Sequence, residues 1–149
     1  MAKMRKEKNN FIIRPVRYVE AARFVKRNHT LRSAPAGHLF SIGAYDGERL
    51  FAVCMCGIPP NQYLNDGVTL YGSRLAKTGN IKNIDSFLFS KIIRIAQILN
   101  YERVITYTSI EETGQVERSL GFHIDGFSRS SSKKYTFKKI RWVRFLKGS

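Results

Sequence analysis

A polar segment between an apolar strand-like run and a long apolar stretch gathers the residues best suited to hold an anion. Arg74 and Lys77 supply positive charge, Gly79 and Asn80 allow a tight turn, and Asn83 precedes the expected helix start. The N–H groups of a first helical turn have no partner within the helix, and the helix dipole favours an anion beside them. These five residues therefore form our predicted anion-binding or cofactor-binding loop.

Four further side chains are candidates for catalysis at this end of the chain. The imidazole of His29 could take a proton from an attacking amine, although a loop histidine with a backbone hydrogen bond is the plain alternative. Ser86, in the first helical turn, could contact a developing oxyanion or only cap the helix. Tyr107 and Ser109 end the following strand and would face the same cleft, unless Tyr107 packs in the core.

Three more titratable residues have two interpretations each. His38 flanks the same loop as His29, and is either a base or a structural histidine. Glu111 and Glu112 start a short expected helix. There they act as a base or favour the helix dipole, and the dipole role is the simpler one.

The elements that must position these residues form a strand–loop–helix–strand crossover. The expected bounds are Val68 to Leu75, Ile84 to Leu99 and Arg103 to Thr108. Such a crossover joins parallel strands, with its helix packed on the sheet through Phe87, Leu88, Ile92, Ile95 and Leu99. Asn83 or Asp85 is the expected N-cap.

The rest of the chain supplies more strands and two more helices. A helix over Arg17 to Arg27 should bury Tyr18, Val19, Ala22, Phe24 and Val25. A second, short helix is expected over Glu111 to Leu120, ended by Gly121. Strands are expected at 11–16, 39–45, 49–57, 122–127 and 135–145, with a hairpin at Asp46-Gly47 and a third strand buried on both faces. This order predicts an α/β (α+β) fold in which helices cover both faces of a mixed sheet.

The charge points to a polyanionic partner. The 149 residues carry 26 Lys and Arg against 11 Asp and Glu, a formal net charge of +15. In a compact chain these positive charges repel one another, and a polyanion would relieve the repulsion. Nucleic acid is the first candidate partner. A basic protein from a basic proteome is the alternative. The bases expected at phosphates, with DNA favoured, are Lys26, Arg27, Arg32, Lys133, Lys134, Lys138, Lys139 and Arg141.

Chain length, the two cysteines and the distribution of apolar residues limit the class of protein. Residues 1–10 are expected to be a basic, mobile lead-in, and 11–149 a single domain that ends in a basic β-pair. Cys54 and Cys56 are expected to be buried free thiols in a reducing compartment. No apolar leader or membrane-length segment is present in the sequence, so we expect a cytoplasmic protein.

The crossover and its loop resemble the GNAT superfamily of acyltransferases, over roughly Phe11 to Phe145. The resemblance implies a sheet splayed between its fourth and fifth strands, Val68–Leu75 and Arg103–Thr108. It also implies an acyl donor, possibly acetyl-CoA, whose pyrophosphate lies on the loop Lys77 to Asp85. The usual Q/R-x-x-G-x-G/A motif is incomplete here, because the chain has no G-x-G.

Four short segments look more narrowly like the Mom-type DNA-modification proteins of phages. They are SRL (73–75), N-x-x-SFL (83–88), ITY (105–107) and GF (121–122). Mom-like proteins modify the exocyclic amine of adenine in DNA, so the resemblance implies DNA modification in a phage or mobile-element context. His29-Thr30 stands where those proteins have His-Tyr, and Val116-Glu117 where a later tyrosine is found.

Two other functions remain open from the sequence. One is an acetyl-CoA-dependent N-acetyltransferase that acts on a protein or on aminoacyl-tRNA. The other is a nucleic-acid-binding or inhibitory module without transfer activity. We predict no dedicated metal site, although His29, His38 and nearby carboxylates could supply ligands.

Overall fold

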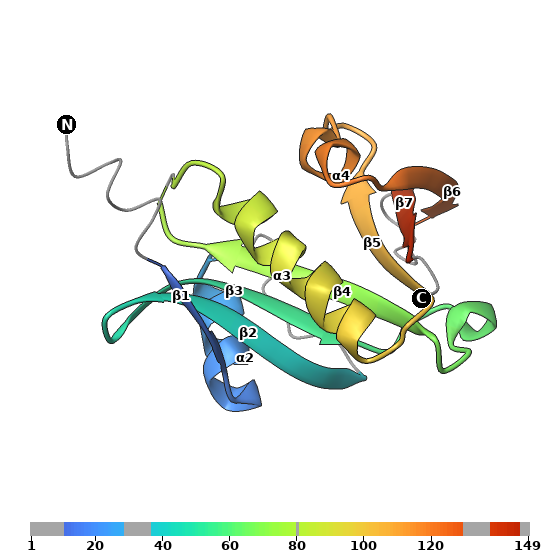
Figure 1. Cartoon of the computed structure of the whole chain (residues 1–149). Coiled ribbons are helices and arrows are strands. Elements are labelled where there is room, and N and C mark those ends of the chain that lie inside the picture. The colour runs from blue at the N-terminus through green and yellow to red at the C-terminus, as the bar shows by residue number, and fades with distance from the viewer. Residues whose placement is uncertain (1–10, 29–36, 80, 130–137, 147–149) are drawn as a thin grey trace.

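The computed structural model describes residues 11–28, 37–79, 81–129 and 138–146, and Figure 1 shows their arrangement. The described strands form one seven-stranded sheet in the order β1-β2-β3-β4-β5-β7-β6. β4 and β5 are parallel, and the other neighbouring pairs are antiparallel. The elements are β1 (Ile12–Pro15), α2 (Tyr18–Asn28), β2 (His38–Asp46), β3 (Arg49–Gly57), a 3-10 turn η1 (Gln62–Leu64), β4 (Thr69–Lys77), α3 (Ile84–Ile98), β5 (Arg103–Ser109), α4 (Gln115–Ser119), β6 (His123–Arg129) and β7 (Lys138–Phe145).

Helices cover both faces of the sheet, as the order of elements predicts. In Figure 1, α3 crosses one face and α2 lies against the other. The alternation along β3 shows why, since Cys54 and Cys56 pack in the α3 cluster while Val53 and Met55 pack in the α2 cluster. β3 is therefore buried on both faces, which explains its nearly unbroken apolar sequence.

The crossover is confirmed, with small changes of bounds. β4 runs two residues further than expected, to Lys77, and α3 begins at Ile84. Leu88 and Ile92 of α3 are fully buried, as predicted, whereas the prediction that Leu99 belongs to the core is wrong. Leu99 is the C-cap residue of α3 and is 57% exposed, because the helix has ended and its apolar face no longer meets the sheet.

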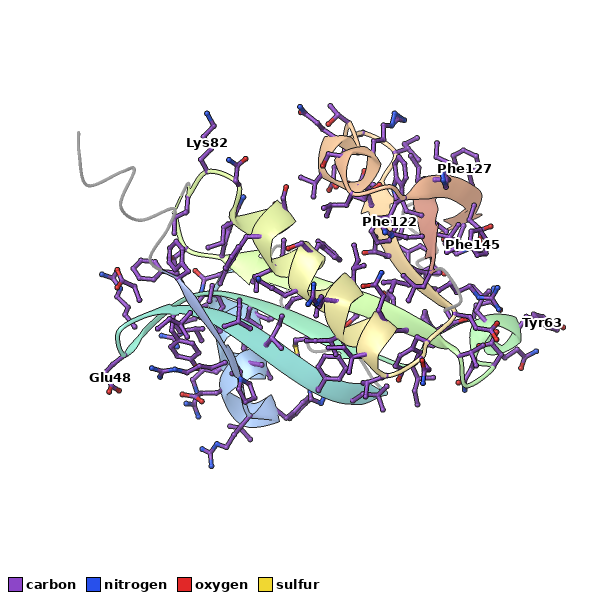
Figure 2. The ribbon with its side chains drawn as sticks, viewed as in Figure 1. Glu48, Tyr63, Lys82, Phe122, Phe127 and Phe145 are labelled. Atoms are coloured by element: carbon purple, nitrogen blue, oxygen red, sulfur yellow. The ribbon has the colours of Figure 1, made fainter. Side chains whose placement is uncertain are left out.

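The first helix is confirmed, but two of its predicted core residues are exposed. Ala21, Phe24 and Val25 make its buried face. Tyr18 and Val19 are 46% and 58% exposed. Tyr18 is the first residue of the helix, and Val19 lies two positions before Ala21, so its side chain points away from the buried side. Among the C-terminal aromatic residues, Trp142 is buried and Phe145 is 61% exposed (Figure 2). Tyr135 and Phe137 lie outside the described residues.

The helix predicted over Glu111 to Leu120 is half as long as expected. Only Gln115–Ser119 is helical, and it starts after Gly114, whose φ is +71°. The N–H of Glu111 donates to the hydroxyl of Ser109, and that of Gln115 to the hydroxyl of Thr113. These bonds build a turn in place of a helical start, so Glu111 and Glu112 do not occupy the first turn of a helix.

Three smaller predictions are confirmed. Asp46 pairs with Arg49 around a left-handed Gly47, which is the expected hairpin. Gly121 follows α4 with a φ of +88°. Cys54 and Cys56 are buried free thiols. Among the described residues, the model contains no helix with the length and apolar character that a membrane crossing requires.

Candidate active site

The sheet opens between its two parallel strands. β4 and β5 pair only from Thr69 with Arg103 to Tyr71 with Ile105, and the strands then diverge. At the apex, the buried hydroxyl of Thr106 donates to the carbonyl of Gly72 at 3.0 Å. This bond joins the strands beyond their last ladder pair. The divergence confirms the expected splay.

An irregularity in β4 lies at the same apex. Met55 of β3 pairs with Arg74, while the next residue pairs with Gly72, so Ser73 is an extra residue. Its hydroxyl donates to the carbonyl of Met55 at 3.0 Å. A bulge of this kind bends its strand and changes the direction of the backbone groups, which is why bulges often lie beside active sites.

A cleft of about 390 Å³ occupies the opening between the strands. Its walls come from β4, β5, α3 and the turn that leads into α4. The lining residues are Gly72, Ser73, Leu75, Asp85, Phe89, Thr106, Tyr107, Thr108, Glu112, Thr113, Gly114, Gln115, Val116 and Glu117. Phe89 is held edge-on by Phe122, which Figure 2 labels, with 6.2 Å between ring centres.

The turn before α4 follows closely around a buried tryptophan. The indole N–H of Trp142 donates to the hydroxyl of Thr108 at 2.9 Å, which fixes the ring beneath the turn. A Cβ on Gly114 would collide with that ring. Gly114 also has a left-handed backbone, so glycine is needed here for space and for conformation. The position of Glu117 at the cleft therefore depends on Gly114.

Three carboxylates line the cleft, namely Asp85, Glu112 and Glu117. Burial raises the pKa of Glu117, and the negative charges of Glu112 and Asp85 raise it further. A carboxylate with a raised pKa in a cleft is a candidate general acid or base. The cleft also presents a local negative field, which favours a cationic group.

Tyr107 lies in the cleft wall as part of an aromatic and charged group. Its ring meets Tyr71 edge-on, with centres 5.7 Å apart at 83°. The Nε of Arg141 donates to Asp125 at 2.7 Å. The hydrogen bond to Asp125 and a further one to Tyr107 raise the pKa of Arg141. The phenol is thus held in place by a fixed guanidinium.

A second hollow, of about 560 Å³, adjoins the cleft and shares Asp85, Gln115 and Val116 with it. It lies at the N-terminus of α3. Asn83, the N-cap residue, has a φ of +66° and makes no side-chain cap hydrogen bond. Since no side chain of the cap residue occupies the helix end, the first-turn N–H groups face a site suited to an anion. Its lining residues are Lys77, Ile81, Lys82, Asn83, Asp85, Ser86, Gln115, Val116 and Ser119.

Lys77 and Asp85 form an ion pair at this junction. The Nζ of Lys77 lies 3.2 Å from the Oδ1 of Asp85, and the side chains are 36% and 28% exposed. The pair is not aligned as a hydrogen bond, and Oδ1 is a buried oxygen without a hydrogen-bond partner among the described residues. An anion bound at the α3 terminus would therefore compete with Asp85 for Lys77.

The predicted loop residues come together only in part. Lys77, Asn83 and Ser86 all line the second hollow. Gly79 is exposed, has a φ of +62°, and has open space where a Cβ would be. The backbone of Arg74 pairs with Met55, while its side chain and all of Asn80 lie outside the described residues.

Of the predicted catalytic residues, Tyr107 lines the cleft and Ser86 lines the adjoining hollow. Ser109 lies in the turn, where its hydroxyl accepts the N–H of Glu111. His38 is 2.7 Å from the hydroxyl of Ser41 and meets Tyr18 edge-on, and burial lowers its pKa. His38 is on β2 and lines neither the cleft nor the adjoining hollow. His29 lies outside the described residues.

The predicted phosphate-contacting bases lie in different settings. Lys26 and Arg27 are exposed in the last turn of α2. Lys139 is half-buried on β7, and Arg141 is engaged by Asp125 and Tyr107. The remaining predicted bases have side chains outside the described part, and these are Arg32, Lys133, Lys134 and Lys138.

Sequence reasoning missed Glu117, Thr106 and Gly114 as site residues. A glycine between Thr113 and Gln115 carries a signal for a turn, and it could have shortened the predicted helix. Thr106 lies in the ITY segment, and Val116-Glu117 stands where Mom-type proteins have a tyrosine, but neither signal gives the residue a role, since the roles depend on strands and a helix distant in sequence. Within the described ranges, no cluster of three or more His, Cys, Asp or Glu could hold a metal ion.

Comparison with known proteins places the architecture. No protein-family model and no curated protein sequence matches the chain. Solved structures match it closely in shape. The ribosomal-protein-S18-alanine N-acetyltransferase of Escherichia coli superposes with a TM-score of 0.73 at 10% identity, covering 93% of this chain and 96% of that one.

Two further matches have similar values. The IAA acetyltransferase of Bacillus cereus gives a TM-score of 0.72 at 12% identity, covering 91% of this chain and 99% of the other. A GNAT family acetyltransferase from Elizabethkingia anophelis, solved with acetyl-CoA bound, gives 0.73 at 14% identity, with 93% and 99% covered. At these identities the matches establish a common fold, and the chain has the GNAT fold.

Proposed function

We propose that this protein is an acyl-CoA-dependent N-acyltransferase, with acetyl-CoA as the simplest donor. The observation that carries the proposal is the splay between β4 and β5, whose cleft adjoins an anion-suited hollow at the N-terminus of α3. The GNAT fold and the acetyl-CoA-bound neighbour of the same fold support it.

The residues present fit such a donor. Lys77, Lys82 and Ser86 would contact its phosphates together with the first-turn N–H groups of α3. The missing G-x-G is compensated in the backbone, because Gly79 and Asn83 both adopt left-handed conformations. Asparagine is among the few residues that tolerate this conformation. The cleft between the strands would receive the acyl end, whose thioester supplies an activated acyl group.

The chain's own residues would orient the acceptor and take up its proton. Glu117 is placed to accept a proton from the acceptor nitrogen at its carboxylate, and its raised pKa suits that task. Tyr107, which Arg141 holds and whose ring packs on Tyr71, is also among the residues that line the cleft. Phe89 and Leu75 supply apolar surface that limits water in the cleft.

The acceptor best suited to this cleft is an aliphatic amine. Such an amine arrives as an ammonium ion, and the three carboxylates around the cleft attract that charge. The Escherichia coli neighbour is named as an N-acetyltransferase of an alanine of ribosomal protein S18. A protein N-terminus or an aminoacyl-tRNA is therefore our first acceptor class.

A Mom-like modification of adenine in DNA is the second candidate. The net charge of +15 favours it. The acidic cleft does not, because the exocyclic amine of adenine is uncharged at neutral pH and lacks the charge attraction that nearby carboxylates offer an ammonium ion. The two candidates share a fold and differ in the acceptor.

Binding and transfer measured together test the proposal. We expect acetyl-CoA to bind in calorimetry and labelled acetyl groups to appear on amine-bearing peptides or aminoacyl-tRNA. Glu117→Gln should lower kcat by roughly 10²-fold or more with binding retained. The matched control is Glu48→Gln, a carboxylate in the β2–β3 turn far from the cleft (Figure 2).

Three outcomes would change the conclusion. A mass shift of adenine nucleosides in cells that express the protein would favour the second candidate. Full activity of Glu117→Gln would remove the proposed base. An absence of both acetyl-CoA binding and transfer would favour a module without transfer activity.

A further inference from the structure

The surface formed by β1 and α2 carries five basic side chains that the proposed transfer chemistry does not use. They are Arg14, Arg17, Arg23, Lys26 and Arg27, and all five are exposed. The same segment, Ile12–Asn28, contains a single acidic residue, Glu20. Within the described residues none of the five forms a salt bridge. We call these five residues the basic α2 face.

Part of this face is hollowed into a groove of about 590 Å³. Arg23 and Arg27 lie one helical turn apart along it, so their guanidinium groups project on the same side. Leu50 and Thr78 form the opposite wall. Arginine binds phosphate through two parallel N–H bonds, and such a pair on a groove suits a row of phosphates.

The groove ends beside the predicted donor loop. Thr78 follows the last residue of β4, and its N–H donates to the carbonyl of Phe51 at 3.0 Å. Gly79 comes next and begins the turn toward α3. A chain lying along the groove would thus arrive at the diverging end of β4, on the sheet face opposite α3.

A lipid surface fits this face less well. Ala21, Phe24 and Val25, the apolar stripe of α2, are buried against the sheet and cannot enter a bilayer. The exposed side is left with separated cations and one carboxylate, Glu20, which lines the groove with Arg23 and Arg27. The excess of cations suits the regularly spaced charges of a nucleic-acid backbone.

From these observations we propose that the basic α2 face binds the phosphate backbone of a nucleic acid, with Arg23 and Arg27 as its central contacts. This binding goes beyond acyl transfer and does not depend on it. Base identity is not read here, because contacts to phosphates carry no sequence information.

The test measures binding of a short labelled DNA duplex, and of an RNA of the same sequence, over a series of salt concentrations. The variant is Arg23→Gln/Arg27→Gln. Loss of two phosphate contacts should lower the slope of log K against log salt by about 1.8 and weaken binding at least about tenfold near 0.1 M salt.

The matched control is Lys91→Gln/Arg94→Gln. Both residues are exposed on α3, across the sheet from α2. The control lowers the formal net charge of +15 by two, as the Arg23→Gln/Arg27→Gln variant does. It should leave the slope nearly unchanged. An equal loss in both variants would mean that net charge alone drives binding, and would overturn the proposal. Stronger binding to anionic vesicles than to either nucleic acid would overturn it too.

Failure of this inference is distinguishable from failure of the proposed function. The Arg23→Gln/Arg27→Gln variant should bind acetyl-CoA like the parent, since neither arginine lines the cleft or the hollow at α3. Glu117→Gln should in turn bind nucleic acid like the parent. Circular dichroism of each variant confirms folding, and the exposed positions make misfolding unexpected.

Discussion

Asp85→Asn should tighten acetyl-CoA binding, although it removes a charged residue from the candidate donor site. In the structure, Asp85 holds Lys77 at 3.2 Å and borders the hollow at the α3 terminus. The Asp85 carboxylate would repel a bound phosphate, and its ion pair keeps Lys77 from contacting that phosphate. Removal of the carboxylate ends the repulsion and frees Lys77, and both changes favour binding.

The magnitude follows from the distance and the exposure. At roughly 6 Å, two unit charges interact by about 0.7 kcal/mol in bulk water and about 3 kcal/mol near a protein surface. The Asp85 side chain is 28% exposed, which places it between these limits. We take about 1 kcal/mol, a dissociation constant lower by about fivefold.

Calorimetric titration with acetyl-CoA checks the prediction at two ionic strengths, because the gain should shrink in salt. Lys77→Met should weaken binding, and the double variant should lie between the single ones. Weaker binding by Asp85→Asn would refute the reasoning, since it would make the carboxylate a support of the loop. Unchanged affinity would place the anion away from α3. The cost to stability should stay near 1 kcal/mol or less, from the lost helix-dipole and ion-pair terms.

Three further predictions concern the scaffold of the site. Burial raises the pKa of Glu117 in the folded state. The protonated form therefore stabilises the fold at low pH, and this contribution is lost as pH rises through the folded pKa. Glu117→Gln should gain stability over the parent with rising pH, as measured by urea unfolding. Desolvation would raise the pKa of Asp66, but hydrogen bonds from the Val68 N–H and from Arg103 outweigh it and lower the pKa to about 2. The ionised form therefore stabilises the fold above the ordinary value of 3.8, and acid titration of Asp66→Asn should lack the loss seen in the parent between those values. Gly114→Ala should lower stability by about 2 kcal/mol or more through backbone strain and overlap with Trp142, whereas Gly47→Ala should cost only the strain of about 1 kcal/mol; thermal melts separate them.

The parts of the fold set by local patterns could be predicted from the sequence. The turn at Asp46-Gly47 needs a left-handed residue, which glycine supplies. The unbroken apolar run of β3 indicates burial on both faces, and the long apolar helix after a polar loop indicates a crossover. In each case the property lies within one segment or between neighbouring segments.

The parts set by distant contacts could not. The helix begins only after Gly114, in a turn that packs on Trp142 of β7. Glu117 is brought to the cleft by that turn, where burial, and then the charges of Glu112 and of Asp85 on α3, raise its pKa. The donor loop offers a different lesson. The loop lacks the glycines of the G-x-G motif, but what its backbone requires is a left-handed conformation, and Asn83 also adopts one.

The distribution of charge links the cleft to the basic α2 face. The chain has only 11 acidic residues, yet three of them line one cleft of about 390 Å³. Five exposed bases without a salt bridge lie together on the opposite side of the sheet within the described part of the chain. An acceptor that satisfies both regions carries a cationic amine on a polyanionic body. Among the acceptors considered above, an aminoacylated RNA meets both conditions. A free peptide meets only the first, and adenine in DNA meets only the second.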